Sequence, residues 1–333
     1  MPATTWSETP DADEDTRFEG YAQWIVELQK RNQHAGSAGR ALHHKGHGVY
    51  EARFEVLEGL PAEARHGLFA TPRSYEALVR YSNGASKRQS DTAGDVRGIA
   101  VKVLGVAGDK VLGSAPTQDF LGILSSAGPF ASADEFMKVV WAARSPLLAP
   151  FRVLGALGPR GFGVVAKLVK GLKAAGTGSL AAKPFFSAVP IQCGPYAVRF
   201  RFAPAAGDAA LPAGADAYGD DLVGRLARGP IRYDLALQFF ESEDRTPIED
   251  PSVDWDAPYV PVARLEVVQQ DAASARGRVL SDRGEGLSFD PWHALVAHKP
   301  LGGIMRMRKH AYYASARGRT VTPEPATIAA LVA

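Results

Sequence analysis

The sequence predicts an α+β fold in which an antiparallel sheet or barrel is covered by helices. Segments in which apolar and polar residues alternate with period two lie on both sides of a segment with helical periodicity. Regular helices do not separate these strand segments one by one, as they would in a chain of βαβ units. Antiparallel pairing is therefore favoured, with an antiparallel β-barrel core and surrounding helices as the expected architecture.

The first strand segment, 47–57, shows the alternation most clearly. Tyr50, Ala52, Phe54 and Val56 share one face, and mostly polar residues lie between them. This is the pattern of a half-buried strand. Further strands are expected at 77–82, 96–104, 196–202, 231–239 and 260–268.

Three regions have helical spacing. An amphipathic helix is expected over 18–33 and another over 300–317, after Pro300. Between them, 132–172 reads as short helices separated by prolines, and Ser132 with Glu135 fits a capping box at its start. The Gly/Ala/Lys-rich segment 171–183 is expected to form a mobile loop.

The length and the tails suggest how the chain is divided. Residues 1–16 are expected to form a flexible N-terminal tail, 17–320 a single domain and 321–333 a C-terminal tail, with two domains as the alternative.

The composition limits the classes of function. With 333 residues, 38 Lys and Arg and 36 Asp and Glu, the net charge is +2, too balanced to form a nucleic-acid groove by charge alone. The single cysteine, Cys193, excludes an intramolecular disulfide. Neither a signal-peptide pattern nor an apolar run of membrane-spanning length is present, so we expect no membrane span and a cytoplasmic protein.

A cluster of histidines precedes the first strand, and three interpretations are open for it. His43 and His47 share a face of an extended chain and could bind a metal, although no acidic residue lies at ligand spacing. The cluster could instead be a solvated loop. In the third interpretation, Arg40 and His43 meet a planar cofactor, the guanidinium at its rim and the imidazole on its face.

Two further arginines, Arg80 and Arg308, lie at positions where a charged side chain is expected to have a specific partner. Arg80, on the same strand face as Ser82, requires a carboxylate, which either Asp95 or a bound ligand could supply. On the last helix, Arg308 lies one turn from Tyr312, and a neighbouring cation favours a phenolate, a suitable donor for Fe(III). The alternative is that Tyr312 simply packs.

Taken together, these residues resemble the haem catalase superfamily. Arg40-x-x-His43-x-Lys-Gly resembles the segment with the propionate arginine and the distal histidine, and Arg80-Tyr-Ser82 resembles the strand whose serine contacts that histidine. The stretch 95–102, Asp-Val-Arg97-Gly-Ile-Ala-Val-Lys, is similar to a third motif of the family.

The last helix carries the fourth motif, Arg308-x-x-x-Tyr312 followed by Arg317, which resembles the proximal helix whose tyrosinate binds the iron. The resemblance implies haem b as cofactor, Tyr312 as iron ligand, and His43 and Ser82 as the catalytic distal pair. It also implies that Arg40 and Arg80, with Arg97 or Arg317, pair with the propionates, and that the haem lies between barrel and helix.

The sequence departs from ordinary catalases in two respects. It is much shorter and is similar to the minimal catalase-related proteins. Where catalases carry a distal asparagine, this chain has 117–126, Thr-Gln-Asp-Phe-Leu-Gly-Ile-Leu-Ser-Ser. Ser125 or Ser126 could donate a hydrogen bond instead, although a hydroxyl is a less fixed donor than an amide.

The resemblance therefore implies a peroxidase that acts on hydrogen peroxide or organic peroxides, uses an unidentified reductant, and has weak or residual catalase activity. Two alternatives remain: a catalase-like enzyme that rearranges organic, fatty-acid hydroperoxides, and a non-catalytic haem or lipid carrier. We expect no nucleic-acid partner, and the chain could form a homo-oligomer.

Overall fold

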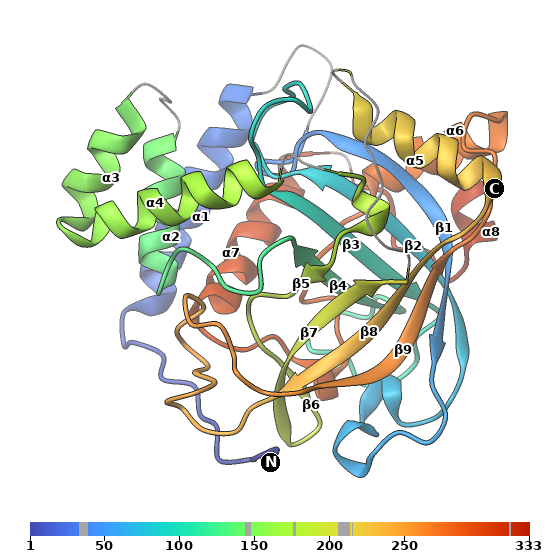
Figure 1. Cartoon of the computed structure of the whole chain (residues 1–333), viewed down its shortest axis with the longest axis horizontal. Coiled ribbons are helices and arrows are strands. Elements are labelled where there is room, and N and C mark those ends of the chain that lie inside the picture. The colour runs from blue at the N-terminus through green and yellow to red at the C-terminus, as the bar shows by residue number, and fades with distance from the viewer. Residues whose placement is uncertain (33–38, 144–147, 176–177, 206–213, 215, 320) are drawn as a thin grey trace.

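The structure is a computed structural model of the chain, and it describes residues 1–32, 39–143, 148–175, 178–205, 214, 216–319 and 321–333. In this part of the chain, antiparallel strands form a barrel and eight α-helices lie around it (Figure 1). The predicted α+β fold with an antiparallel β-barrel core is therefore confirmed.

Eight strands close the barrel in the order β1-β2-β3-β4-β5-β7-β8-β9, and β9 returns to β1. Every pairing is antiparallel. A further short strand, β6, pairs with the start of β7. The strands are β1 (Gly46–Val56), β2 (Ser74–Asn83), β3 (Arg97–Leu104), β4 (Thr117–Ile123), β5 (Phe185–Phe186), β6 (Ile191–Cys193), β7 (Tyr196–Pro204), β8 (Ile231–Phe239) and β9 (Tyr259–Val267).

Large apolar side chains fill the barrel. Phe54 on β1 stacks on Phe120 of β4, and Phe120 meets Phe200 edge to face. The face predicted for the first strand points into this core, where Phe54 is fully buried. On β2, Tyr81 points inward, whereas Arg80 and Ser82 lie on the outer face, because side chains alternate along a strand.

Helices cover the outside of the barrel on two sides (Figure 1). On one side α1, α2, α3, α4 and α7 gather, and on the other lie α5, α6 and α8. The helices are α1 (Glu14–Asn32), α2 (Ala133–Ala143), α3 (Ala149–Leu157), α4 (Arg160–Ala175), α5 (Ala217–Arg228), α6 (Ala275–Gly286), α7 (Gly303–Arg317) and α8 (Ile328–Val332). Short 3-10 helices lie at Ala62–Ala64, Gly67–Phe69, Leu180–Ala182 and Val296–His298.

Helix α7 is held against the barrel at its N-terminal end. Its N-cap residue, Gly302, has φ 85°, and a Cβ there would lie 2.7 Å from the carbonyl oxygen of Ile248. Both the left-handed conformation and the close approach favour glycine. The amide of Gly303 then donates to the carboxylate of Glu249 at 2.6 Å, so an N–H of the first turn is satisfied.

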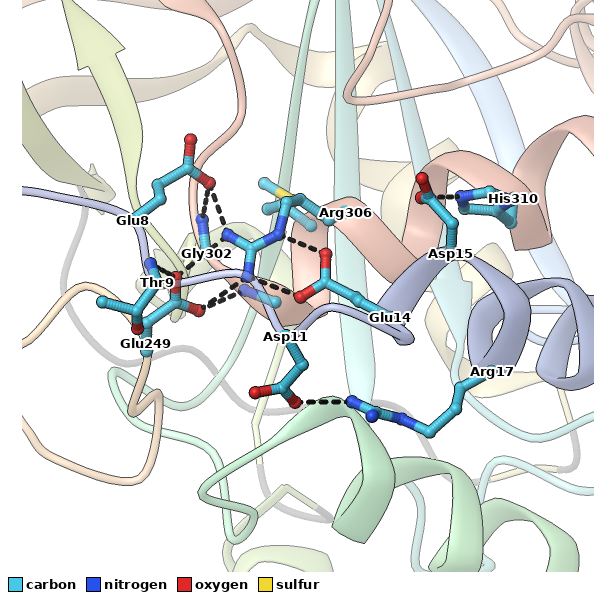
Figure 2. Close-up of polar contacts among 12 residues, drawn as sticks. Glu8, Thr9, Asp11, Glu14, Asp15, Arg17, Glu249, Gly302, Arg306 and His310 are labelled. Atoms are coloured by element: carbon cyan, nitrogen blue, oxygen red, sulfur yellow. Dashed lines mark hydrogen bonds and ion pairs between the residues drawn. The ribbon is translucent and has the colours of Figure 1, made fainter.

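The N-terminal residues take part in this anchoring, in contrast to the expected flexible tail of 1–16. Ala3 donates its backbone N–H to the carbonyl of Phe240 at 2.9 Å, and the Trp6 indole donates to Pro195 O at 2.8 Å. Glu8 accepts a bond from the Gly302 amide at 2.9 Å (Figure 2).

Arg306 on α7 joins these segments into one cluster. Its guanidinium contacts the carboxylates of Glu8, Glu14 and Glu249 at 2.6, 2.6 and 2.9 Å (Figure 2). Glu14 is the first residue of α1, so one side chain ties the start of α7 to the N-terminal segment, to α1 and to the loop before β9.

Other segments also differ from expectation. The expected loop 171–183 is helical up to Ala175, and Leu180 is buried against the barrel core, while 176–177 lie outside the described residues. In the expected C-terminal tail, Ile328 and Leu331 of α8 pack on the outer face of the barrel beside Val49. The single domain over 17–320 stays a prediction. Among the described residues, no helix is long and apolar enough to cross a membrane.

Candidate active site

A pocket lies between the outer face of β2, β3 and β4 and helix α7. Four of the residues that the sequence singled out on separate motifs, Arg40, His43, Arg308 and Tyr312, line this pocket together. Arg80 and Ser82 reach it from β2. Phe130, Phe136, Ile25 and Met307 contribute apolar side chains from the surrounding helices and loops.

His43 is held in an unusual backbone conformation. It has φ 53°, and the second described non-glycine residue with a positive φ, Ala188 at 57°, lines the same pocket. Such conformations are costly and persist where the surrounding structure imposes them, often at functional sites. Here the His43 amide donates to Gly84 O, and its carbonyl accepts a bond from Arg80 Nη2, both at 3.0 Å.

The imidazole of His43 is fixed by β2 and β3. Its Nδ1 lies 3.0 Å from Ser82 Oγ, and Ser82 is paired with Gly98 in the sheet. A Cβ at Gly98 would lie only 2.7 Å from His43 Cε1, so glycine makes room for the ring. In the tautomer in which Nδ1 carries the ring proton and donates it to the serine, Nε2 is the nitrogen left to accept a proton.

The charge state of His43 follows from its surroundings. Burial, and then the positive charges of Arg80, Arg308 and Arg40, lower the pKa of His43 to about 3. The ring is therefore neutral at physiological pH and can act as a base.

Tyr312 enters the same pocket from α7. The guanidinium of Arg308, one turn earlier on the helix, donates from Nη2 to Tyr312 Oη at 2.8 Å. Both side chains are partly buried, and the buried face of the helix, with Met305, Met307 and Ala311, is packed against the rest of the protein. The phenolic oxygen thus has a guanidinium group held beside it.

Three arginines gather at one end of the pocket. Arg40 Nη1 and Arg80 Nε donate to the carboxylate of Glu285, at 2.8 and 2.9 Å. Arg319, just beyond α7, lies close by and donates to the carbonyls of Gly286 and Leu287, each at 3.2 Å. The carboxylate that pairs with Arg80 is therefore that of Glu285, and the expected salt bridge to Asp95 is not formed.

Positive charge exceeds negative charge at this end. Burial and the neighbouring Arg80 lower the pKa of Arg40 to about 9, and burial with Arg80 also lowers that of Arg319. Partial burial of Glu285 raises its pKa, but Arg80 and Arg40 together hold it below the usual value. Three guanidinium groups thus surround one carboxylate, and further anionic groups would be stabilised there.

Arg97 and Arg317, which were expected to be candidate propionate ligands, are not brought to the pocket. Arg97 is fully buried elsewhere: it donates to the carbonyls of Asp91 and Ala93 and lies over the ring of Tyr218. Arg317 points outward from α7 toward the hydroxyl of Tyr313. The helical turn explains this, because 317 is five residues from Tyr312 and thus lies on another face.

The wall formed by β4 is apolar where the sequence suggested a serine donor. Leu121, Gly122 and Ile123 line it. Ser125 Oγ donates to Ala127 O at 2.6 Å, and Ser126 Oγ donates to Asp254 at 3.0 Å. Neither serine is part of the pocket lining.

The other residues of the histidine cluster turn away from His43. His44 Nδ1 lies 3.0 Å from Arg40 O, and His47 Nε2 lies 2.7 Å from Asn83 Oδ1. Lys45 pairs with Asp91 at 2.8 Å. In the part of the chain that the structure describes, no three His, Cys, Asp or Glu side chains form a metal-binding group.

The donor set of the pocket fits haem. A phenol from α7 and an imidazole from the loop before β1 both line it, together with apolar side chains. The arginine-rich end has charge to receive two carboxylates. These features match a planar, apolar macrocycle with a metal at its centre and two anionic groups at one edge.

The sequence is similar to that of a known peroxidase. A catalase-related peroxidase of Mycolicibacterium paratuberculosis is 29% identical over 302 residues, which cover 84% of this chain and 89% of that protein. No protein-family model matches.

Solved catalases share the fold. A fungal catalase superposes with TM-score 0.61 at 15% identity over 96% of this chain, and catalase A of Saccharomyces cerevisiae with 0.62 at 14% over 96%. A bacterial catalase matches with TM-score 0.58 and 16% identity over the whole chain. The chain spans 65–68% of the length of these catalases.

The chain thus has the fold of the solved catalases, and its sequence is similar to that of a catalase-related peroxidase.

Sequence reasoning missed two charged residues of the site, Glu285 and Arg319. Glu285 ends a glycine-rich helix far along the chain, and nothing in its local sequence points to Arg40 or Arg80. Arg319 lies beyond the end of α7, so helical spacing from Tyr312 does not place it, and only its nearness in sequence to Arg317 pointed to it.

Proposed function

We propose that the chain is a haem-dependent peroxidase that acts on hydrogen peroxide or organic peroxides and has weak or residual catalase activity. The observation that carries this proposal is the meeting of His43 and Tyr312 in one pocket that has three arginines at one end. A carrier would need the arginines and the phenol, but not a neutral, fixed imidazole.

Haem b is the cofactor that we propose for the pocket, and when bound it would supply the redox chemistry that cleaves a peroxide O–O bond. Tyr312 would hold the iron through its phenolate, and Arg308 would stabilise that anion. Arg40, Arg80 and Arg319 would hold the carboxylates at the rim by charge-assisted hydrogen bonds.

His43 performs the proton transfer in this proposal. Its neutral ring takes a proton from one peroxide oxygen at Nε2 and returns it to the other, which becomes the leaving group. Ser82 is a positioning residue that holds Nδ1 and thereby leaves Nε2 free for this task.

The apolar wall of β4 supports peroxidase over catalase activity. Catalase turnover requires a second peroxide to be held in one orientation, and Leu121, Gly122 and Ile123 offer no polar side chain for it. Oxidation of an organic reductant does not require that second site. The same wall favours the second candidate, rearrangement of a fatty-acid hydroperoxide, because an acyl chain is compatible with apolar side chains.

Rapid mixing of the haem-loaded protein with three solutions distinguishes these activities: hydrogen peroxide alone, hydrogen peroxide with an aromatic reductant, and a fatty-acid hydroperoxide. The proposal predicts reductant-dependent turnover and little oxygen release. Conversion of the lipid hydroperoxide without consumption of reductant would establish the second candidate. Haem binding without reaction with any peroxide would support the carrier. A cytoplasmic location and homo-oligomerisation remain predictions beside this proposal.

A further inference from the structure

Helices α3 and α4 form a hairpin whose outer face is unusually apolar. Phe151 is 73% exposed and Phe162 is 68% exposed, and apart from Met1 they are the most exposed of the large apolar side chains in the described residues. Val169 is 46% exposed. Phe162 and Val169 line a shallow hollow together with Pro150, Leu154, Val165 and Ala166. Contiguous exposed apolar surface of this kind marks an interaction site.

The charge around this surface has one sign. Residues 136–175 contain seven lysines and arginines and no aspartate or glutamate, although the whole chain carries only +2. Lys138, Lys167 and Lys170 are exposed, and Lys170 borders the apolar hollow itself. Arg160 contacts Glu135, the last acidic residue before this segment. The hairpin therefore combines an apolar face with a cationic rim.

The inner face of the hairpin connects it to the pocket. Val153 of α3 and Val164 of α4 are buried against Phe130, with Phe136 of α2 beside them. Phe130 and Phe136 also line the pocket that holds His43. Phe130 and Phe136 are thus shared between the inner packing of the hairpin and the lining of the candidate active site.

The position of the hairpin leaves its outer face accessible. Figure 1 shows α3 at the edge of the molecule and α4 running from that edge across α2 toward the barrel, on the opposite side from α5, α6 and α8. No other element in that view covers the outer side of α3.

We propose that the α3–α4 hairpin binds the surface of an anionic lipid membrane. Phe151 and Phe162 insert among the acyl chains near the headgroups, and Lys167 and Lys170 contact the anionic headgroups. A second copy of the chain is the less favourable occupant, because two such faces would bring like charges together. An anionic bilayer instead complements both the charge and the apolar area.

Membrane binding by this surface also suggests which class of substrate reaches the candidate active site. Membrane binding through the hairpin would place the pocket next to the bilayer, and hydroperoxides of fatty-acyl chains would be the peroxides that it meets. This second step depends on the proposed function, whereas the binding itself does not.

Co-sedimentation of the full chain with vesicles tests the binding. The proposal predicts at least about tenfold stronger partitioning into vesicles of phosphatidylglycerol and phosphatidylcholine than into phosphatidylcholine alone, with a decrease as salt is raised. Phe151→Ser with Phe162→Ser, and separately Lys167→Glu with Lys170→Glu, are each expected to lower partitioning by about tenfold.

Two matched controls address composition and charge. Val296→Ser removes an apolar side chain that is 53% exposed on another surface, and Arg65→Glu with Arg73→Glu makes the same change in net charge between β1 and β2. Both controls should partition like the wild type. Circular dichroism and thermal melting confirm that each variant is folded.

Equal partitioning into both kinds of vesicle, or equal loss in hairpin and control variants, would overturn the proposal. A dimer that depends on Phe151 and Phe162, without vesicle binding, would assign the face to a second copy. These readouts need neither haem nor turnover, so they can fail while the peroxidase proposal stands. If binding holds but the haem-loaded protein does not consume acyl hydroperoxides in the vesicles, only the substrate class is wrong.

Discussion

Arg308 and Tyr312 lie one turn apart on α7, and Nη2 of the guanidinium donates a 2.8 Å hydrogen bond to the phenolic oxygen. The guanidinium carbon also lies 5.1 Å from the centre of the tyrosine ring. The two side chains thus bring a phenolic oxygen and a guanidinium group to the pocket that His43 also lines.

Replacement of His43 separates cofactor binding from peroxide chemistry. His43→Ala should leave haem bound, because the rim arginines and Tyr312 remain, but should slow the reaction with peroxide by about 100-fold or more, the range of a lost general base. His44→Ala is the matched control, since His44 is bonded to Arg40 O and does not line the pocket. Rapid-mixing absorbance would measure both, and equal rates in the two variants would exclude His43 as the base.

The low pKa of His43 gives a specific pH dependence. Because burial and then Arg80 lower it to about 3, the ring stays neutral and able to accept a proton down to acid pH. The rate of the peroxide step should therefore be constant between about pH 5 and 8. A histidine with an ordinary pKa would protonate as the pH falls through about 6.5, and the rate would decline there. A decline of that kind would show that the buried, cationic surroundings of His43 do not set its protonation.

Arg319 and Arg317 provide a test within one segment. Arg319→Ala should weaken the affinity for hemin by about tenfold or more, because a charge-assisted hydrogen bond contributes about 1.5–3 kcal/mol. Arg317→Ala should leave the affinity unchanged, since that side chain is exposed and directed to Tyr313. Hemin titration followed by absorbance measures both affinities. The reverse order of effects would restore the assignment that the sequence suggested.

The anchoring of α7 predicts a dependence of stability on pH. Burial raises the pKa of Glu8, but hydrogen bonds from the Gly302 amide and Arg306 outweigh this and leave it below the usual value. A carboxylate with a lowered pKa stabilises the folded state above its unfolded pKa, and this stabilisation is lost as the pH falls through the folded value.

Glu8→Gln should therefore reduce the free energy of unfolding at pH 7 by about 1–3 kcal/mol. The difference from the wild type should shrink below about pH 4. Glu19→Gln on the exposed side of α1 is the control and should have little effect. Denaturant unfolding at several pH values measures these differences. A Glu8→Gln variant as stable as the wild type at pH 7 would show that the cluster around Arg306 contributes nothing to stability.

Part of the barrel was accessible to sequence reasoning because segments of strands such as β1 and β8 alternate between buried and exposed residues. Alternation located β1, β2 and β8, and the long apolar run located β3. By contrast, β5 and β6 have two and three residues, too few for any periodicity to be visible. Helix α6 contains three glycines, which disfavour a helix, yet Ser274 caps it and Leu280 is buried against the barrel.

Only those residues of the candidate site that belong to short sequence motifs could be predicted. Arg40, His43, Arg80, Ser82, Arg308 and Tyr312 do meet in the structure. Glu285 could not be foreseen, because its place beside Arg40 and Arg80 depends on tertiary packing. The contacts of the N-terminal segment could not be foreseen for a similar reason. Its acidic residues are typical of a solvated tail, but Glu14 pairs with Arg306, which lies 292 positions away in the sequence.

The most direct test of the account is the absorption spectrum of the protein loaded with hemin, compared with Tyr312→Phe and Tyr313→Phe. Tyr313 is 65% exposed on the same helix and is the matched control. We expect the Soret band and weak charge-transfer bands of high-spin ferric haem bound to tyrosinate in the wild type and in Tyr313→Phe, and their loss or shift in Tyr312→Phe. Identical spectra in all three proteins, or no bound haem in the wild type, would contradict it.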